Sequence, residues 1–353
     1  MSLPLSRHRL TRRSFFPPFL FFLFLLLLLT PLCLAVGAER ISPGNILTAL
    51  AGKGDQVIST IIYDLRLPRL LLAIGVGAAL ATTGAVFQAL LKNPLAEPYI
   101  LGISNGCAVG AILGINLPII TAMLGIAFNP GQVGVTLLSF LGGAIVVMVV
   151  LWIGRRSVGS DTDSMVLGGV MVAAIGAAII FLLLHLLPNV RGAIQWMLGD
   201  LSRVSSDVGY MSLILFAGLL FFSFFVGNSL NALALGEEQA ASLGLNVRGA
   251  TIVAYLGASL VIGLATSFCG AIGFVGLVVP HIIRRLVGPD HRLLMPLSVI
   301  GGGIFLLLCD TAARSLLPAT GASGGELPVG AVTALVGAPL FIRLLTKGRE
   351  SKH

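Results

Sequence analysis

Long apolar segments divide this chain, and they constrain its fold more than any other feature of the sequence. About 20 consecutive apolar residues cross the hydrocarbon core of a bilayer as an α-helix. Hydrophobic residues make up 56% of the chain and charged residues only 10%, whereas a soluble domain carries about 25% charged residues. The sequence therefore predicts an all-α polytopic membrane protein with about ten transmembrane helices. The predicted spans lie at approximately 15–37, 67–91, 98–117, 132–153, 164–187, 208–228, 249–268, 272–287, 293–317 and 327–346.

Three parts of this pattern leave alternatives. Residues 118–131 either extend a neighbouring helix or form a short extra one, and the 272–287 segment is short and contains Pro280. The first segment follows several arginines, as in a signal peptide, but its apolar run exceeds the ~7–15 residues typical of such a signal. We therefore expect a retained first helix, a cytoplasmic tail at 1–14, a single transmembrane domain at 15–346 and a second tail at 347–353.

The Lys and Arg residues predict the orientation of these helices. The chain carries a formal net charge of +8, but no basic run with interleaved aromatic residues that would suggest nucleic-acid binding. If both termini are cytoplasmic, most of the 22 Lys and Arg residues fall on the cytoplasmic side, as the positive-inside rule requires. The sequence thus predicts a multi-pass protein of the cytoplasmic or inner membrane. The exceptions on the outer side are Arg40, Lys53, Arg66, Arg69, Arg191, Arg203 and Arg314.

Motifs for catalysis are missing from the sequence. It contains no G-x-x-x-x-G-K-[ST] phosphate loop, no HExxH and no GxSxG, so ATP would have to bind a partner subunit. The histidines are scattered, and the four cysteines lie singly in apolar stretches, which predicts buried thiols rather than disulfides or metal ligands. We therefore expect no catalytic residue, metal site or cofactor in this chain. The cysteines are Cys33, Cys107, Cys269 and Cys309.

Ionisable residues inside the predicted spans are few. Asp310 and Arg314 are four residues apart near the outer end of the 293–317 segment, so they can pair on one helix face. A secondary transporter coupled to ions would usually show acidic residues in mid-membrane or broken helices in repeated halves, and we find neither pattern. A passive channel or an ion-coupled secondary transporter stays open as the alternative function, and an intramembrane enzyme lacks a catalytic set.

Two glycine patterns predict local structure. Gly102, Gly106, Gly110 and Gly114 recur every four residues, which favours close packing of two helices. The loop at about 229–248 contains Gly236 and Gly244, which bound a short amphipathic stretch. Such a helix can dock into a groove of a partner protein. Its predicted docking residues are Leu235, Gly236, Glu237, Glu238, Ala240, Leu243 and Gly244, with Ala241 in the same apolar patch.

Several ordered blocks resemble the FecCD family of permeases, which import ferric siderophores, haem and vitamin B12. The stretch Glu237–Gly244 is similar to the coupling segment of binding-protein-dependent ABC importers. Further blocks are 66–69 (RLPR), 88–102 (QALLKNPLAEPYILG), 273–292 (GFVGLVVPH followed by IIRRLVGPDHR) and 326–339 (ELPVGAVTALVGAP). The resemblance covers roughly residues 60–346. It implies a type II ABC importer permease that forms a homodimer and works with two cytoplasmic ATPases and a periplasmic or lipid-anchored binding protein.

The resemblance also implies roles for individual residues. Arg66, Arg69 and Arg314 would receive acidic residues of the binding protein, a task that suits the planar guanidinium. Asn93 and Leu95 match one cytoplasmic gate loop of the family, and Thr162 and Asp163 match the other more loosely, because acidic residues replace small polar ones there. The ligand would be an iron-siderophore, haem or cobalamin, and the sequence does not choose among them.

Overall fold

The computed structural model describes residues 12–37, 41–97, 102–126, 128–156, 161–202, 205–319 and 326–350. Within these ranges every regular element is helical. The helices are α1 (Arg12–Ala35), α2 (Pro43–Leu50), α3 (Gln56–Thr60), the π-helical η1 (Ile61–Arg66), α4 (Leu67–Leu90), α5 (Ile103–Met123), α6 (Gly131–Arg156), α7 (Asp161–Leu186), α8 (Val190–Met197), α9 (Ser206–Leu235), α10 (Glu237–Ser242), α11 (Val247–Cys269), α12 (Val275–Val287), α13 (His291–Ala319) and α14 (Val329–Glu350).

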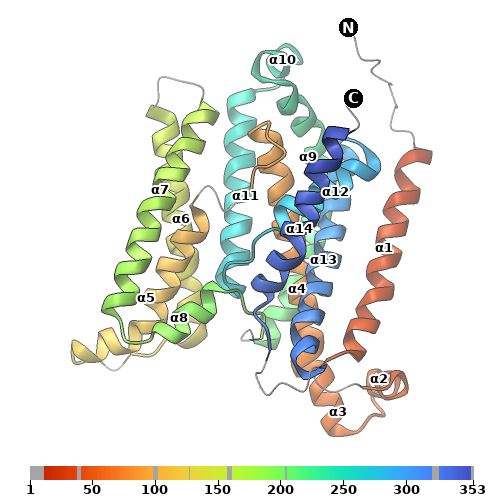
Figure 1. Ribbon diagram of the computed structural model, residues 1–353, viewed down its shortest axis with the longest axis vertical. Coiled ribbons are helices and arrows are strands. Elements are labelled where there is room, and N and C mark those ends of the chain that lie inside the picture. Colours follow the sequence, from red (N-terminus) through yellow and green to blue (C-terminus); the bar gives the residue numbers. More distant parts are fainter. Residues whose placement is uncertain are drawn as a thin grey trace.

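The helices form two groups that α11 joins. In the first group, α4 packs against α9, α12 and α13, and α1 and α14 lie against α13. In the second group, α5, α6 and α7 pack on one another, while α11 contacts both α4 and α6. Figure 1 shows the α5–α7 group on one side, α11 between, and the α4 group on the other side. The α10 helix and the C-terminal end of α14 lie at the same end of the molecule (Figure 1).

The α4 helix is the centre of the first group. Its residues from Leu70 to Leu90 are buried almost without interruption, and glycines make that burial possible. A Cβ at Gly77 would collide with the backbone of Gly302 in α13, and one at Gly84 would collide with Gly276 in α12. Close backbone approach through small residues drives helix association in membranes, where the hydrophobic effect between helices is absent.

Most of the predicted spans are confirmed as helices. Eight helices in the described part of the chain are long and apolar enough to cross a membrane. The other two predicted spans are shorter: α12 has 13 residues, and the apolar part of α14 is Val329–Arg343. Residues 118–131 form no separate helix, because α5 continues to Met123 and α6 begins at Gly131. The α14 helix also runs to Glu350, past the predicted boundary of the tail at 347.

The sequence did not predict the short helices outside the spans. The α2 and α8 helices have eight residues each, too few for a hydropathy search to find. The α3, η1 and α4 elements run together as one apolar stretch of 35 residues, Gln56–Leu90, so the second span begins earlier than expected. These added elements lie at the end of the molecule opposite α10 (Figure 1).

The predicted glycine stripe packs two helices together. Cβ atoms at Gly106, Gly110 and Gly114 of α5 would all collide with α6, so the stripe has the packing role expected of it. Gly102 precedes α5 with a φ of +76° and faces α7 instead. All four cysteines are buried and free.

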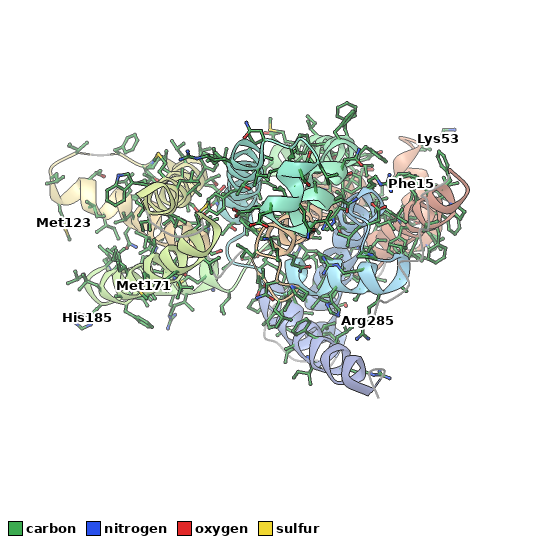
Figure 2. The ribbon with its side chains drawn as sticks, turned by 90° about the horizontal axis from the view of Figure 1, so that it is seen from above. Phe15, Lys53, Met123, Met171, His185 and Arg285 are labelled. Atoms are coloured by element: carbon green, nitrogen blue, oxygen red, sulfur yellow. The ribbon has the colours of Figure 1, made fainter. Side chains whose placement is uncertain are left out.

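The outer surface of the spans is apolar. In α7, Met171, Ile175 and Leu182 are each more than half exposed, and only 17% of the most apolar window of that helix is buried. Figure 2 shows Met171 and His185 projecting outward at the α7 end of the molecule, whereas Phe15 lies at the α1 end. Lipid or a second protein chain must cover these side chains.

Candidate functional site

The segment between α9 and α11 forms the short helix that its glycines predict. The α9 helix continues to Leu235, further than the predicted 228, and ends because Gly236 takes a φ of +120° that L side chains rarely adopt. The six-residue α10 follows, and Gly244 reverses the chain with a φ of +83°. The α10 helix packs only against α9 and α11 among the larger contacts of the described elements. It is therefore a protruding helix bounded by two glycine hinges.

Only part of the predicted docking patch faces outward. Leu235 is 58% exposed and Leu243 67% exposed, and Glu237, Glu238 and Ala241 are exposed too. Ala240 is fully buried, so its predicted place in the exposed patch is wrong. The reason is the tight turn, in which Ala240 donates to Gly236 O and accepts from Leu245 N. The exposed apolar surface of this segment is thus carried mainly by Leu235 and Leu243.

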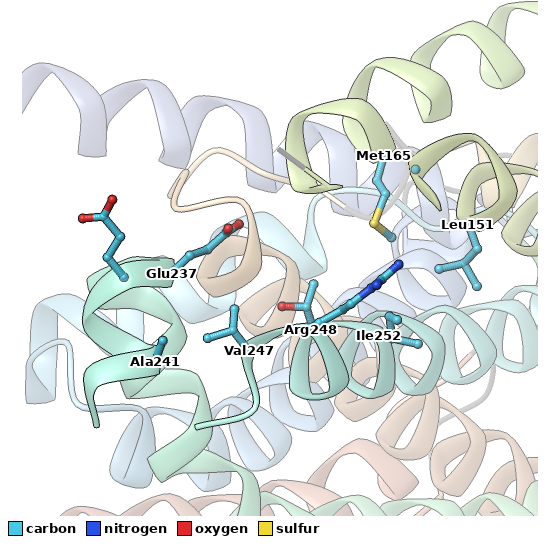
Figure 3. Close-up of a pocket in the computed structure, with 10 residues that line it drawn as sticks. Leu151, Met165, Glu237, Ala241, Val247, Arg248 and Ile252 are labelled. Carbon is cyan, nitrogen blue, oxygen red and sulfur yellow. The ribbon is translucent and has the colours of Figure 1, made fainter. Parts of the chain in front are cut away.

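A pocket of about 370 Å³ separates α10 from the ends of α6 and α7. Its walls come from Leu151 of α6, Met165 of α7, Glu237 of α10 and the first turns of α11. Figure 3 shows the Arg248 side chain extending from α11 toward Met165 and Leu151. The space beside α10 leaves the segment room to shift relative to the α5–α7 group.

The predicted gate loop lies beside this segment. Asn93 and Leu95 are exposed, and the Asn93 side chain accepts a hydrogen bond from Leu95 N at 2.9 Å. Lys92, which precedes them, has a φ of +48°. Its ammonium nitrogen lies 3.8 Å from where a Cβ on Gly236 would stand. The structure thus brings the gate loop next to the first hinge of α10.

Glu97, at the end of the same loop, was not singled out from the sequence. Its Oε1 accepts a hydrogen bond of 2.7 Å from Phe274 N, at the start of α12. Burial raises the pKa of this carboxyl, and the hydrogen bond from Phe274 opposes that shift only in part. One signal was available, because Glu97 is the only acidic residue between Asp64 and Asp161.

A polar cluster holds the turn between α12 and α13 to α9. Asn231 of α9 donates to Asp290 Oδ1 at 2.8 Å and accepts from the backbone N–H of His291 at 2.8 Å. Its Oδ1 also lies 2.8 Å from His291 Nδ1, and Arg292 binds Asp290 at 2.6 Å. Partial burial alone would raise the pKa of Asp290, but hydrogen bonds from Arg292 and Asn231 hold it below its usual range.

An ionic cluster lies at the opposite end of the molecule and contains Arg69. This guanidinium binds Asp310 of α13 at 2.8 Å and Glu326, before α14, at 2.6 Å. Asp310 is fully buried, and Arg314 lies 3.5 Å from it, so the predicted pairing of Asp310 with Arg314 is confirmed. The predicted docking residue Arg69 is thus already paired within its own chain, and its side chain is only 14% exposed.

The other two arginines bind the end of α1. Arg66 donates to Leu34 O at 2.9 Å, and Arg314 donates to Cys33 O at 2.7 Å. Carbonyls in the last turn of a helix have no partner within the helix, which explains why both guanidinium groups gather there. Arg314 is 4% exposed, so it presents no surface to a partner in this conformation. Its docking role stays a prediction, and it requires Arg314 to leave these partners.

Two sequence predictions lie at the edge of what the structure describes. Thr162 and Asp163 belong to the first turn of α7, but their side chains are outside the described part. Among the described residues, no three His, Cys, Asp or Glu side chains come together as a metal site.

Comparison with known sequences decides the family. The sequence model of the FecCD transport family matches residues 25–347, which is nearly the whole chain. The chain belongs to the FecCD transport family. Membership also accounts for the ordered motif blocks, which lie within the matched residues.

Individual relatives of this FecCD chain agree with that assignment. A chain named as an ABC transporter permease in Methanocaldococcus jannaschii is 36% identical over 89% of both sequences. The cobalamin import permease BtuC of Halobacterium salinarum is 38% identical over 82% of this chain and 74% of its own length. An inward-facing transporter described as metal-chelate type superposes with a TM-score of 0.78, 28% identity and coverage of 93% and 98% of the two chains.

The FecCD chain is therefore a multi-pass ABC importer permease with the type II fold. Family membership makes it a transporter component, and permeases of this kind work with separate ATPase and substrate-binding proteins. The geometry adds which of its residues stand at each end: a protruding glycine-bounded helix at one, and an arginine–carboxylate cluster at the other.

Proposed function

We propose that this permease translocates a bulky metal chelate, an iron-siderophore, haem or cobalamin, across the inner membrane with energy from ATP. The observation that carries the proposal is the exposed α10 helix between two glycine hinges, in a chain matched by the FecCD family from residue 25 to 347. An exposed helix of this kind offers a docking surface to a separate ATPase. ATP binding and hydrolysis then belong to that partner.

The assembly we infer is a homodimer with two ATPases and one binding protein. The apolar, exposed face of α7 supports a second copy, because a closed path needs walls on all sides and one chain supplies only some of them. Both termini would be cytoplasmic, since the start of α1 and the end of α14 lie toward the end of the molecule that carries α10. Asn93 and Leu95 would meet their symmetry mates at the cytoplasmic gate, with Thr162 and Asp163 at the second gate loop.

The binding protein would dock at the other end. Arg66 and Arg69 are the arginines placed best for this, because both retain some exposure, whereas Arg314 is buried. Carboxylates of the binding protein would compete with Glu326 for the Arg69 guanidinium, since Glu326 is 41% exposed and its bond to Arg69 is accessible to water.

A gradient-driven mechanism would need a carboxylate that takes up and releases its ion. Asp310 is the fully buried carboxylate nearest such a role, but it lies between Arg69 at 2.8 Å and Arg314 at 3.5 Å. Both of its oxygens face guanidinium groups of its own chain, so Asp310 ties helices together and is not open to a transported ion. This pairing supports coupling to ATP rather than to protons.

Cobalamin is the first ligand to test, because a relative with 38% identity is named as a cobalamin import permease. The experiment measures uptake of radiolabelled cobalamin, a ferric siderophore and haemin into proteoliposomes that contain the permease, its ATPase and its binding protein. Saturable uptake of one chelate, suppressed by an excess of the same unlabelled chelate, supports the proposal. If none of the three enters, the proposed substrate class is wrong.

A further inference from the structure

Two residues other than glycine adopt the left-handed backbone conformation in the described chain, and both border the gate loop. Lys92 has a φ of +48° at the start of the 91–97 loop, and Phe274 has a φ of +68° just before α12. This conformation is unfavourable for an L-residue, and such strain persists where surrounding contacts hold it, often at switch regions. The contacts of these two residues therefore indicate where the gate loop is held.

The first contact joins the gate loop to the segment that carries α10. Lys92 extends to Gly236, the hinge before α10, where its ammonium nitrogen lies 3.8 Å from the position of a Cβ. The second contact joins the far end of the loop to α12, because Glu97 Oε1 accepts the hydrogen bond from Phe274 N at 2.7 Å. A carboxylate at the N-terminus of a helix is also stabilised by the helix dipole.

The third contact closes a ring. Beyond the C-terminal end of α12, Asp290 and His291 bind Asn231, which is five positions before Gly236 in the chain. The path runs from Gly236 to Lys92, along the loop to Glu97, through α12 to Asp290, and back through Asn231 to Gly236. The junctions at Glu97 and Asn231 are hydrogen bonds, the junction between Lys92 and Gly236 is a close approach, and the chain itself supplies the rest.

The α12 helix is suited to transmit movement as a rigid body. It has 13 residues, which is about 20 Å of helix, and Val275, Val278 and Ile283 are at most 1% exposed. Gln88 of α4 donates to Gly276 O in its first turn at 3.1 Å. The N-terminal half of α12 is buried and bonded at its first turn, and the turn after its C-terminal end is bonded to α9, so the helix can move as one piece.

We propose that Glu97 and Asn231 are positioning residues for energy coupling: Glu97 fastens the start of α12, and Asn231 fastens the turn between α12 and α13, so that α12 carries movement of the α10 segment to the gate loop. The inference rests on the proposed docking of the ATPase at α10 and adds the route by which docking reaches the gate. Simple packing does not account for the arrangement, because a packed loop needs no strained residue at two of its junctions.

The test measures how nucleotide changes the gate loop, without any transported ligand. The native cysteines are replaced and Leu95→Cys is introduced as a reporter in the permease–ATPase complex. The rate of maleimide labelling at position 95 is compared between the nucleotide-free and vanadate-trapped states. The variants are Glu97→Ala, Glu97→Gln, Asn231→Ala and Asn231→Asp, with Asn189→Ala as control. Asn189 caps α8 by accepting from Gly192 N, and α8 lies toward the end of the molecule opposite α10.

The expected result is a labelling ratio that falls roughly fivefold or more in Glu97→Ala and Asn231→Ala, as typical coupling energies imply. ATPase co-purification and ATP hydrolysis should persist. Glu97→Gln should restore the ratio, because its amide oxygen still accepts from Phe274 N. Asn231→Asp keeps the size of the side chain but places a carboxylate against Asp290, so the labelling ratio should stay low in this variant too. This variant therefore tests the inference even if Asn231→Ala fails to insert in the membrane.

Two outcomes would overturn the inference. One is a wild-type ratio in Glu97→Ala and in either Asn231 variant. The other is an equal fall in Asn189→Ala, which would indicate general loosening of the fold. Failure of the unsubstituted chain to hold its ATPase is a different result, because it would refute the proposed function itself.

Discussion

Arg69 has two carboxylate partners that differ in exposure to solvent. Asp310 is fully buried, whereas Glu326 is 41% exposed. Losing Arg69 would leave Asp310 buried with Arg314 as its remaining cation, and removing one partner of a buried pair costs about 3–5 kcal/mol. A substitution of Arg69 would therefore change the stability of the fold as well as the affinity for the binding protein. Arg66 and Glu326 allow cleaner experiments, because Glu326 is 41% exposed and Arg66 donates to a backbone carbonyl, Leu34 O.

We expect Glu326→Gln to tighten docking of the binding protein. The amide removes the charge that competes for Arg69, and an exposed ion pair is worth about 0.2–1 kcal/mol, so affinity should rise by up to about fivefold. The measurement is the dissociation constant of the binding protein for the purified transporter. A weaker complex in Glu326→Gln would show that Glu326 itself contacts the partner.

Arg66→Glu should weaken the same complex roughly tenfold, because a charge-assisted hydrogen bond contributes about 1.5–3 kcal/mol. The effect should shrink in high salt, which screens exposed charges. Lys53→Glu is the matched control, since Lys53 is exposed between α2 and α3, at the same end of the molecule, and undergoes the same change of charge. Equal losses in the two variants would indicate a general charge effect instead of a specific contact at Arg66.

Among the elements, α10 is the one that the proposed ATPase would grip. Leu243→Arg should prevent docking, because an unpaired guanidinium in the partner's groove costs several kcal/mol, which is roughly a hundredfold or more in affinity. Leu47→Arg in α2 is a suitable control, since both leucines are 67% exposed but lie at opposite ends of the molecule. Co-purification of the ATPase with each variant gives the answer, and normal recovery with Leu243→Arg would exclude α10 as the main docking surface.

The gate loop supplies a second test at this scale. Asn93 and Leu95 are exposed in the single chain, so a cysteine at either position can reach its counterpart if the two loops meet at the dimer axis. After replacement of the native cysteines, disulfide formation across the dimer is expected in at least one of the nucleotide-free, ATP-bound and post-hydrolysis states. A complete lack of cross-linked dimer in all three states contradicts the placement of the gate.

What the sequence could predict depends on how far apart the interacting residues lie in the chain. Gly236 and Gly244 mark the ends of α10 locally, and Asp310 with Arg314 is a four-residue helical pair. In contrast, Arg69 and Asp310 are 241 positions apart, and Glu97 and Phe274 are 177 apart. Only the packing of α4, α12 and α13 brings these pairs together, so the helical periodicity of the sequence does not predict these contacts. The same packing buries Arg314, which the resemblance alone placed at a docking surface.

For the whole molecule, the division into two helix groups joined by α11 has a mechanical consequence. The α10 segment contacts α9 and α11 and faces a pocket on the α6–α7 side, so movement at α10 can reach the two groups unequally. An importer that opens alternately to each side needs such relative movement. An energy source at α10 and an arginine cluster at the other end are consistent with ligand entering from one side and ATP acting on the other.

The most direct test measures chelate accumulation in proteoliposomes that hold the permease, its ATPase and its binding protein, with ionophores present to abolish proton and sodium gradients. Labelled cobalamin, ferric siderophore and haemin are supplied on the side of the binding protein, and ATP on the side of α10. We predict that one of them accumulates only with hydrolysable ATP, and that Leu243→Arg abolishes the accumulation while Leu47→Arg does not. Accumulation that proceeds without ATP, or that an imposed ion gradient drives in the absence of the ATPase, would contradict the assignment of this chain as an ATP-driven importer permease.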